Sequence, residues 1–178
     1  MEWLILLMAF VHDLSVAVYL GGAVAMEFIL APAQSSIPPA QAQVMGEKTS
    51  NRFLILVWIS LILLFITGAF RLYFKGMLFG TQSIFVPPLT LDYSYGQTVF
   101  ALFIVWLILM INGAIITFVL RPKLTGKMTA GVSKAQADQS SAGKMSAATW
   151  IERLTRADLV LAIVATLLGA SLLRGGLF

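Results

Sequence analysis

Long apolar runs separated by short polar stretches dominate the sequence. Four runs reach or approach the roughly 20 residues that an α-helix needs to cross the roughly 30 Å hydrocarbon layer of a bilayer. These runs cover residues 3–31, 53–74, 98–120 and 157–173. The pattern therefore predicts an all-α, polytopic membrane protein that forms one domain, a bundle of four transmembrane helices.

Residues that commonly start or stop helices lie near the ends of these runs. Pro32 and Pro122 follow the first and third runs, where we expect the helices to end. The polar residues at 49–51 offer N-caps for the second helix. Thr149 and Glu152 have the spacing of a capping box, which predicts that the fourth helix begins beside them.

The composition supports a bilayer environment. Hydrophobic residues make up 59% of the chain and charged residues 11%, with a mean hydropathy of +0.90. The absence of cysteine excludes disulfides, thiolate metal sites, iron–sulfur clusters and cysteine nucleophiles. The net charge of +4 does not indicate a nucleic-acid partner, because the basic residues lie between the apolar runs. The lipid bilayer is the expected partner.

The basic residues are distributed unevenly between the connections. Nine lie after the first or third run: Lys48, Arg52, Arg121, Lys123, Lys127, Lys134, Lys144, Arg153 and Arg156. The other side of the membrane holds only Arg71, Lys75 and Arg174. By the positive-inside rule, we expect both termini outside, residues 76–97 in an outer loop and residues 121–156 in a cytoplasmic loop. The protein would then be a multi-pass protein of the cell membrane.

The two long connections differ in composition. Residues 124–148 are rich in Ala, Ser, Gly, Lys and Gln, so we expect them to be mobile or held by a partner. The outer connection carries aromatic residues and a proline pair that are suited to a membrane interface. They are Phe79, Phe85, Tyr93, Tyr95 and Pro87–Pro88.

Two rows of residues along the first run predict how its helix packs. Alternating four- and three-residue steps place one row on a continuous stripe that should face the bundle. This row comprises Met8, His12, Ser15, Tyr19, Gly22 and Met26. A second row of small residues, Ala17, Gly21 and Ala25, would let a neighbouring helix approach closely. We therefore expect the first helix to be central.

His12 is the only histidine and lies roughly 13 Å below the outer edge of its run. An ionisable group at that depth needs a partner. One interpretation is a neutral imidazole hydrogen-bonded to a neighbouring helix, and another is a ligand of haem iron or a metal. Met8, four residues earlier, could assist His12 at a copper ion. A second axial ligand for haem would have to come from methionine, another chain or nothing.

The remaining intramembrane polar groups have structural interpretations. Asp13 and Arg71 are expected to form an ion pair between the first two helices. Glu27 can be neutralised at the cytoplasmic interface by Lys48 or Arg52. Asn112, Thr117 and Thr166 are expected to form hydrogen bonds between helices, and Asn112 with Gly113 is the best candidate for a local opening. Motifs of hydrolases and nucleotide-binding enzymes are absent.

Several of these positions together resemble a known family. The positions are His12, Gly21–Gly22, Glu27, Pro32, residues 37–40, Arg52–Phe53 and residues 67–71. This set resembles the copper resistance D (CopD-like) membrane proteins, and the resemblance implies copper handling. Related membrane protoporphyrinogen oxidases carry a histidine on the first helix that is associated with haem b, which carries over to His12 alone. Residues 100–103 hold no lysine, whereas such relatives place a lysine on the third helix.

Two classes of function follow. The first is a CopD-like membrane protein that binds haem b or copper through His12, with Met8 assisting a metal, in a redox or copper-handling role. The second is a non-catalytic accessory subunit of a larger membrane complex, with no cofactor. Other membrane subunits or further copies of the chain are the expected protein partners, and catalytic activity stays open.

Overall fold

The computed structural model describes residues 2–79, 83, 94–125 and 134–177, and these form helices without strands. The first rod comprises α1 (Glu2–Ala25), a π-helical segment η1 (Met26–Leu30) and α2 (Ala31–Ser35). The second is α3 (Pro39–Phe74), and the third comprises α5 (Ser94–Ala114), the π-helical η2 (Ile115–Leu120) and α6 (Arg121–Thr125). The fourth is α7 (Lys134–Ser171), followed by a short 3-10 turn, η3 (Leu172–Arg174).

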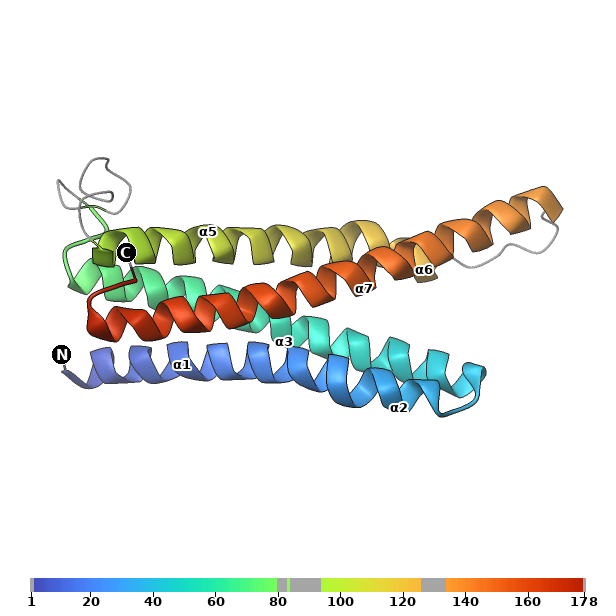
Figure 1. Ribbon diagram of the computed structural model, residues 1–178, viewed down its shortest axis with the longest axis horizontal. Coiled ribbons are helices and arrows are strands. Elements are labelled where there is room, and N and C mark those ends of the chain that lie inside the picture. Colours follow the sequence, from blue (N-terminus) through green and yellow to red (C-terminus); the bar gives the residue numbers. More distant parts are fainter. Residues whose placement is uncertain (1, 80–82, 84–93, 126–133, 178) are drawn as a thin grey trace.

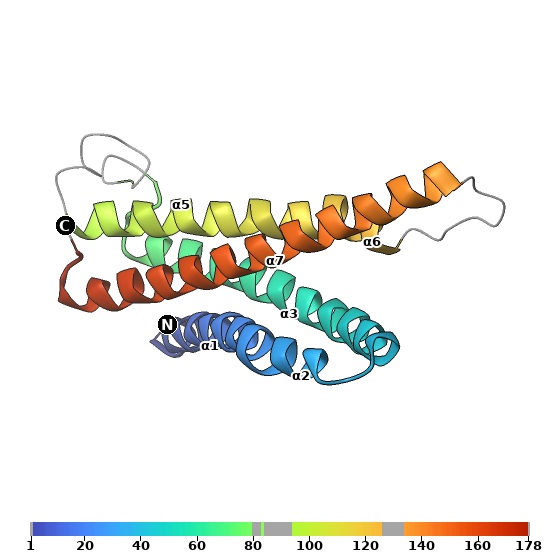
Figure 2. The same cartoon turned by 45° about the vertical axis from the view of Figure 1, so that its right-hand side comes forward.

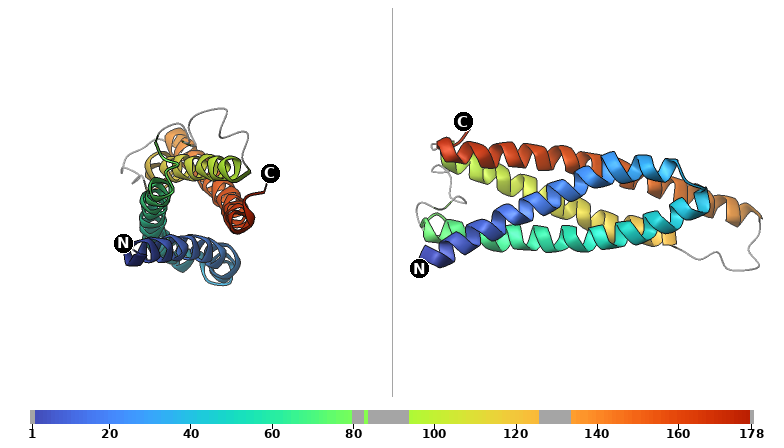
Figure 3. Two further views of the ribbon diagram at one scale, coloured as in Figure 1. Left: turned by 90° about the vertical axis from the view of Figure 1, so that its left-hand side faces the viewer. Right: turned by 90° about the horizontal axis from the view of Figure 1, so that it is seen from below.

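The four rods form a ring in chain order. Each packs against the next, and α7 closes the ring on α1 (Figure 3). Both termini lie at the same end of the bundle (Figure 1). Each rod contains a segment long and apolar enough to cross a membrane: Glu2–Ser35, Val44–Phe74, Ser94–Leu124 and Ala142–Arg174. The prediction of an all-α protein with four such helices is confirmed.

The distribution of apolar side chains fits a lipid environment. A buried cluster at the centre of the bundle contains Tyr19, Val57, Leu61, Val105, Leu109 and Ala162. Large apolar side chains also cover the outside, where Trp3, Phe28 and Phe118 are each at least two-thirds exposed. A water-soluble domain would not present so much contiguous apolar surface, whereas hydrocarbon chains solvate it favourably.

Two helices begin earlier than the sequence pattern predicts. α3 starts at Pro39 rather than near residue 51, because Pro38 takes an extended conformation and Pro39 suits the first helical position. α7 starts at Lys134, and its first turns project beyond the other helices (Figure 2). Thr149 is therefore inside α7, where its hydroxyl donates to the Met145 carbonyl at 3.0 Å. The predicted cap at Thr149 is therefore wrong, and residues 134–148 of the connection are helical.

Pro32 and Pro122 do not end their helices. Each is the second residue of a helix that continues the rod, and each follows a π-helical segment. Proline lacks an N–H, and its ring clashes with the carbonyl four residues earlier in a regular α-helix. A π turn widens the backbone just before the ring, which removes that clash without ending the helix.

α1 packs through a different row from the one expected. A Cβ atom at Gly21 would meet nothing within 4 Å, and Ala17 is exposed. A Cβ atom at Gly22 would lie 2.7 Å from Cε2 of Phe53 on α3. Close approach therefore occurs at Gly22, on the predicted stripe. α1 is also the least buried of the four spans, so the expectation that it is central is wrong.

The connection between α3 and α5 is described only in part, at residues 75–79 and 83. The Lys75 ammonium donates a hydrogen bond to the Tyr95 hydroxyl at 2.6 Å, which links the end of α3 to the start of α5. Phe79 is largely exposed, as the interface interpretation expects. The corresponding predictions for Phe85, Tyr93 and Pro87–Pro88 lie outside the described residues.

Candidate functional site

His12 is held by a residue on the neighbouring helix. Its Nδ1 lies 2.7 Å from Oγ1 of Thr67, so the contact joins α1 to α3. Thr67 is 1% exposed, which makes its hydroxyl a desolvated partner. The hydrogen bond to a neighbouring helix that the sequence suggested is therefore present, and Thr67 is the partner that the sequence did not identify.

The hydroxyl of Thr67 also lies near a carbonyl group of its own helix. Oγ1 of Thr67 is 2.6 Å from the Leu63 carbonyl oxygen. A hydroxyl has one proton, and donation to Leu63 leaves Oγ1 to accept from Nδ1 of His12. In that arrangement Nδ1 carries the imidazole proton. A neutral imidazole in this tautomer keeps its lone pair on Nε2.

Gly68, the residue after Thr67, lies beside the ring. A Cβ atom at Gly68 would lie 3.8 Å from Cε1 of His12 and within 4 Å of no other atom outside its own helical turn and neighbours. Met8 lies one turn before His12 and is half-buried. Asp13 and Arg71 are close enough to act electrostatically on His12.

The geometry of His12 fits an axial or metal ligand. Histidines that bind metals almost always donate their other N–H to an oxygen acceptor, which fixes the tautomer and increases the basicity of the ligand. Thr67 supplies that acceptor. His12 is thus the residue that could hold haem or copper through Nε2, with Met8 close in sequence.

The predicted ion pair between Asp13 and Arg71 is not formed at contact distance. Both side chains are exposed. Within the described part of the chain, the ion pairs shorter than 4.0 Å both involve Arg156. Coupling between Asp13 and Arg71 over a longer distance stays a prediction.

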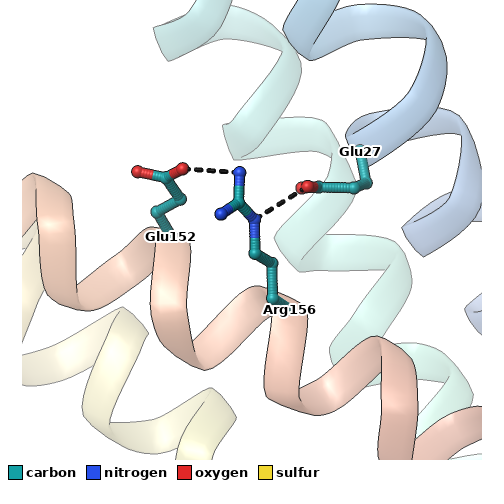
Figure 4. A network of polar contacts seen from close by, with 3 residues as sticks. All are labelled: Glu27, Glu152 and Arg156. Carbon is teal, nitrogen blue, oxygen red and sulfur yellow. Dashed lines mark hydrogen bonds and ion pairs between the residues drawn. The ribbon is translucent and has the colours of Figure 1, made fainter.

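Glu27 has a different partner from those expected. Nε of Arg156 lies 2.8 Å from Oε1 of Glu27, which joins η1 to α7. Nη2 of Arg156 contacts Glu152 one turn earlier at 2.7 Å (Figure 4). The predicted neutralisation by Lys48 or Arg52 is therefore replaced by Arg156, which the sequence placed on the same side of the membrane.

Interhelical hydrogen bonds are confirmed for two of the three residues predicted to make them. Nε1 of Trp58 donates to Oγ1 of Thr117 at 3.1 Å. Nδ2 of Asn112 donates to Oδ1 of Asp158 at 2.8 Å. Thr166 instead donates to the Ala162 carbonyl of its own helix, so the expectation is wrong there.

Asp158 is a buried carboxyl group that the sequence reasoning missed. It is 9% exposed and lies inside the candidate span Ala142–Arg174. The only sequence signal was an acidic residue beside the predicted start of the fourth run at residue 157. Because α7 starts much earlier, Asp158 lies within the helical bundle and not at its edge.

The fold and these contacts define a class, a four-helix membrane protein with polar groups buried between its helices. Comparison of the chain with family models, characterised proteins and solved structures finds no match in any of the three.

Proposed function

We propose that this chain is a CopD-like membrane protein that binds haem b through Nε2 of His12 and serves in electron transfer. The observation that supports this most is the pair of hydrogen bonds from His12 to Thr67 and from Thr67 to Leu63. When Thr67 donates to Leu63, Nδ1 of His12 is protonated and Nε2 is free, which is the form in which an imidazole could hold haem iron.

Ligand chemistry favours haem over copper. The sequence has one histidine and no cysteine, so a copper site would depend on methionine and oxygen ligands beyond His12. Haem brings four nitrogen ligands of its own and needs one or two from protein. A single, well-oriented imidazole therefore satisfies the haem requirement, and Met8 remains the first candidate for a copper site.

The protein residues have separate tasks in this proposal. His12 holds the group, Thr67 fixes the orientation and tautomer of His12, and Gly68 leaves space beside the ring. The apolar helices around the site limit access of water. When bound, haem supplies one-electron chemistry.

The proposal also places the protein in the cell membrane. The nine-to-three distribution of Lys and Arg supports an orientation with both termini outside and the connection between α5 and α7 in the cytoplasm. His12 then lies in the outer half of the bilayer, where an external electron donor or acceptor has the shorter path to it.

The test is an optical spectrum and metal analysis of the native protein purified in detergent, alongside His12→Ala. We expect a Soret band in the native protein and its loss in His12→Ala, with helix content by circular dichroism unchanged. Met8→Leu should keep the band if haem is bound, and should weaken metal retention if copper is bound. A native protein without haem or copper, or a His12→Ala variant that keeps its full complement, would favour the accessory-subunit function.

A further inference from the structure

A cavity of about 100 Å³ lies between the helices on the side of the Glu27–Arg156 contact. Residues from all four rods line it, including Tyr19 on α1, Phe53 on α3, Gly113 on α5 and Asp158 on α7. Gly113 is the position predicted as a local opening. Tyr19 lies seven residues after His12, about 10 Å further along the helix, so this cavity is separate from the proposed haem site.

The carboxyl group of Asp158 has one oxygen without a partner. Asn112 donates to Oδ1, and no other hydrogen bond or ion pair to Asp158 is found among the described residues. Arg156 contacts Glu27 and Glu152 instead, and residues two apart on a helix point to different sides. An unpaired carboxylate inside a membrane span is costly, so Asp158 needs either a proton or a cation.

The cavity distinguishes these two possibilities. A proton would neutralise the carboxyl group without requiring empty space next to it, and Asp158 could then be packed as tightly as Leu61. Space bounded by all four helices can instead hold a ligand with several atoms. Because Asp158 is nine-tenths buried and lines this space, the ligand would meet the carboxyl group directly.

The rest of the lining identifies the chemistry of the ligand. The aromatic rings of Tyr19 and Phe53 lie on the walls, and aromatic faces attract organic cations. Tyr19 is 6% exposed and lines the same cavity as Asp158. The remaining wall is mostly apolar, with Ser50 and Thr155 as its other polar residues. A strongly hydrated inorganic ion would lose most of its oxygen ligands there, whereas an alkyl chain would be well solvated.

The π-helical segments lie at the same place. Met26 begins η1 and Ile116 belongs to η2, and both line the cavity. Such segments occur frequently at functional sites. Because Pro32 and Pro122 follow the two segments, the wide backbone on both sides of the cavity is encoded by the sequence.

We propose that this cavity binds a small alkylammonium compound, with its ammonium group on Asp158 and its apolar body against Tyr19, Phe53 and the aliphatic walls. The site does not depend on the haem proposal, since it uses no residue of the His12 site. Asn112 orients the carboxylate, and Asp158 supplies the charge.

The experiment uses the full chain in a non-ionic detergent, with n-butylammonium as the probe and 1-butanol as its neutral equivalent in size. We expect n-butylammonium to bind saturably in calorimetry and to raise the thermal midpoint of the native protein, and 1-butanol to do neither. Asp158→Asn should weaken n-butylammonium binding by roughly 30-fold or more, because the charge partner is lost. Asp13→Asn is the matched control, since it removes an exposed carboxylate from another span and should bind as the native protein does.

A second variant distinguishes loss of the binding site from loss of the fold. Ala23→Leu keeps Asp158 but fills part of the cavity, so it should also lose binding while helix content and elution volume stay native. Four outcomes would overturn the proposal: no saturable binding, equal stabilisation by 1-butanol, unchanged binding in Asp158→Asn, or the same Asp158-dependent stabilisation by sodium chloride. The first, with a protonated Asp158 carboxyl band in the infrared spectrum at neutral pH, would assign the site to a proton alone.

Discussion

At the residue scale, the single proton of the Thr67 hydroxyl decides which nitrogen of His12 is protonated. In the arrangement that we propose, Thr67 donates to the Leu63 carbonyl and can only accept from His12. The sequence places both His12 and Thr67 inside apolar runs, where each needs a partner. It could not pair them, because the pairing depends on the rotation of α1 and α3 about their own axes, which small differences in packing decide.

Replacing Thr67 by Val should destabilise the protein and weaken haem retention. The imidazole N–H would lose its buried acceptor, at a cost of about 1–3 kcal/mol in the free energy of unfolding. Haem affinity should fall roughly 10- to 100-fold, as is typical when a metal-binding histidine loses its hydrogen-bond partner. Thr166→Val is the control, because its hydroxyl bonds only within α7. Equal losses in the two variants would show that the Thr67 contact has no special role.

Asp13 and Arg71 can be tested by a double-mutant cycle in detergent. If the predicted pair acts at longer range, the losses in unfolding free energy for Asp13→Asn and Arg71→Gln should couple by more than about 0.5 kcal/mol. Additive losses would show that Asp13 and Arg71 do not interact. Because both charges act on His12, the Soret position of each variant would report a separate effect on the haem site.

At the element scale, the lengths of the helices depend on helix propensity and on the prolines, and the apolar pattern does not report either. Residues 134–150 contain many good helix formers, chiefly Ala, Lys, Gln and Met, but no apolar stripe. They extend α7 by about four turns before its apolar part begins. The prolines at 32 and 122 likewise cause π turns in place of helix ends. Sequence reading therefore predicted the apolar parts of the helices and missed their polar extensions.

The packed face of α1 gives a direct comparison between adjacent glycines. Gly22→Ala would place Cβ 2.7 Å from the Phe53 ring, which must then move, and we expect a loss of about 1–3 kcal/mol in unfolding free energy. Gly21→Ala meets open space and should be neutral or stabilising by up to about 1 kcal/mol. Helix propensity affects both variants alike, so their difference reports the contact. A more damaging Gly21→Ala would contradict the packed face described for α1.

At the scale of the whole molecule, the sequence predicts the number of spanning helices, but it does not predict which side chains meet between them. Hydropathy alone identifies four spans, because a bilayer demands long apolar helices. Consecutive helices are neighbours in the ring. The cavity around Asp158 depends on the early start of α7 and on two π-helical segments, and neither has a strong signal in an apolar pattern. This explains why His12 was singled out and Asp158 was missed.

The charge distribution predicts a specific orientation of the whole bundle. A reporter fused after Phe178 should be outside the cell, and one placed within residues 127–144 should be in the cytoplasm. Labelling of single cysteines with an impermeant reagent in intact cells measures both positions. Native Cys is absent, so each introduced thiol reports alone. The opposite labelling pattern would reverse the orientation and place His12 in the cytoplasmic half.

The protonation state of His12 tests directly whether Nε2 is free to bind haem. The chain has one histidine, so protein labelled with ¹⁵N-histidine gives one pair of imidazole nitrogen signals in magnetic resonance. In haem-free protein at neutral pH, we predict a protonated Nδ1 and an unprotonated Nε2, and loss of this preference in Thr67→Val. A ring protonated on Nε2, in native protein that keeps its fold, would contradict the account, because the nitrogen assigned to the ligand would then carry the proton.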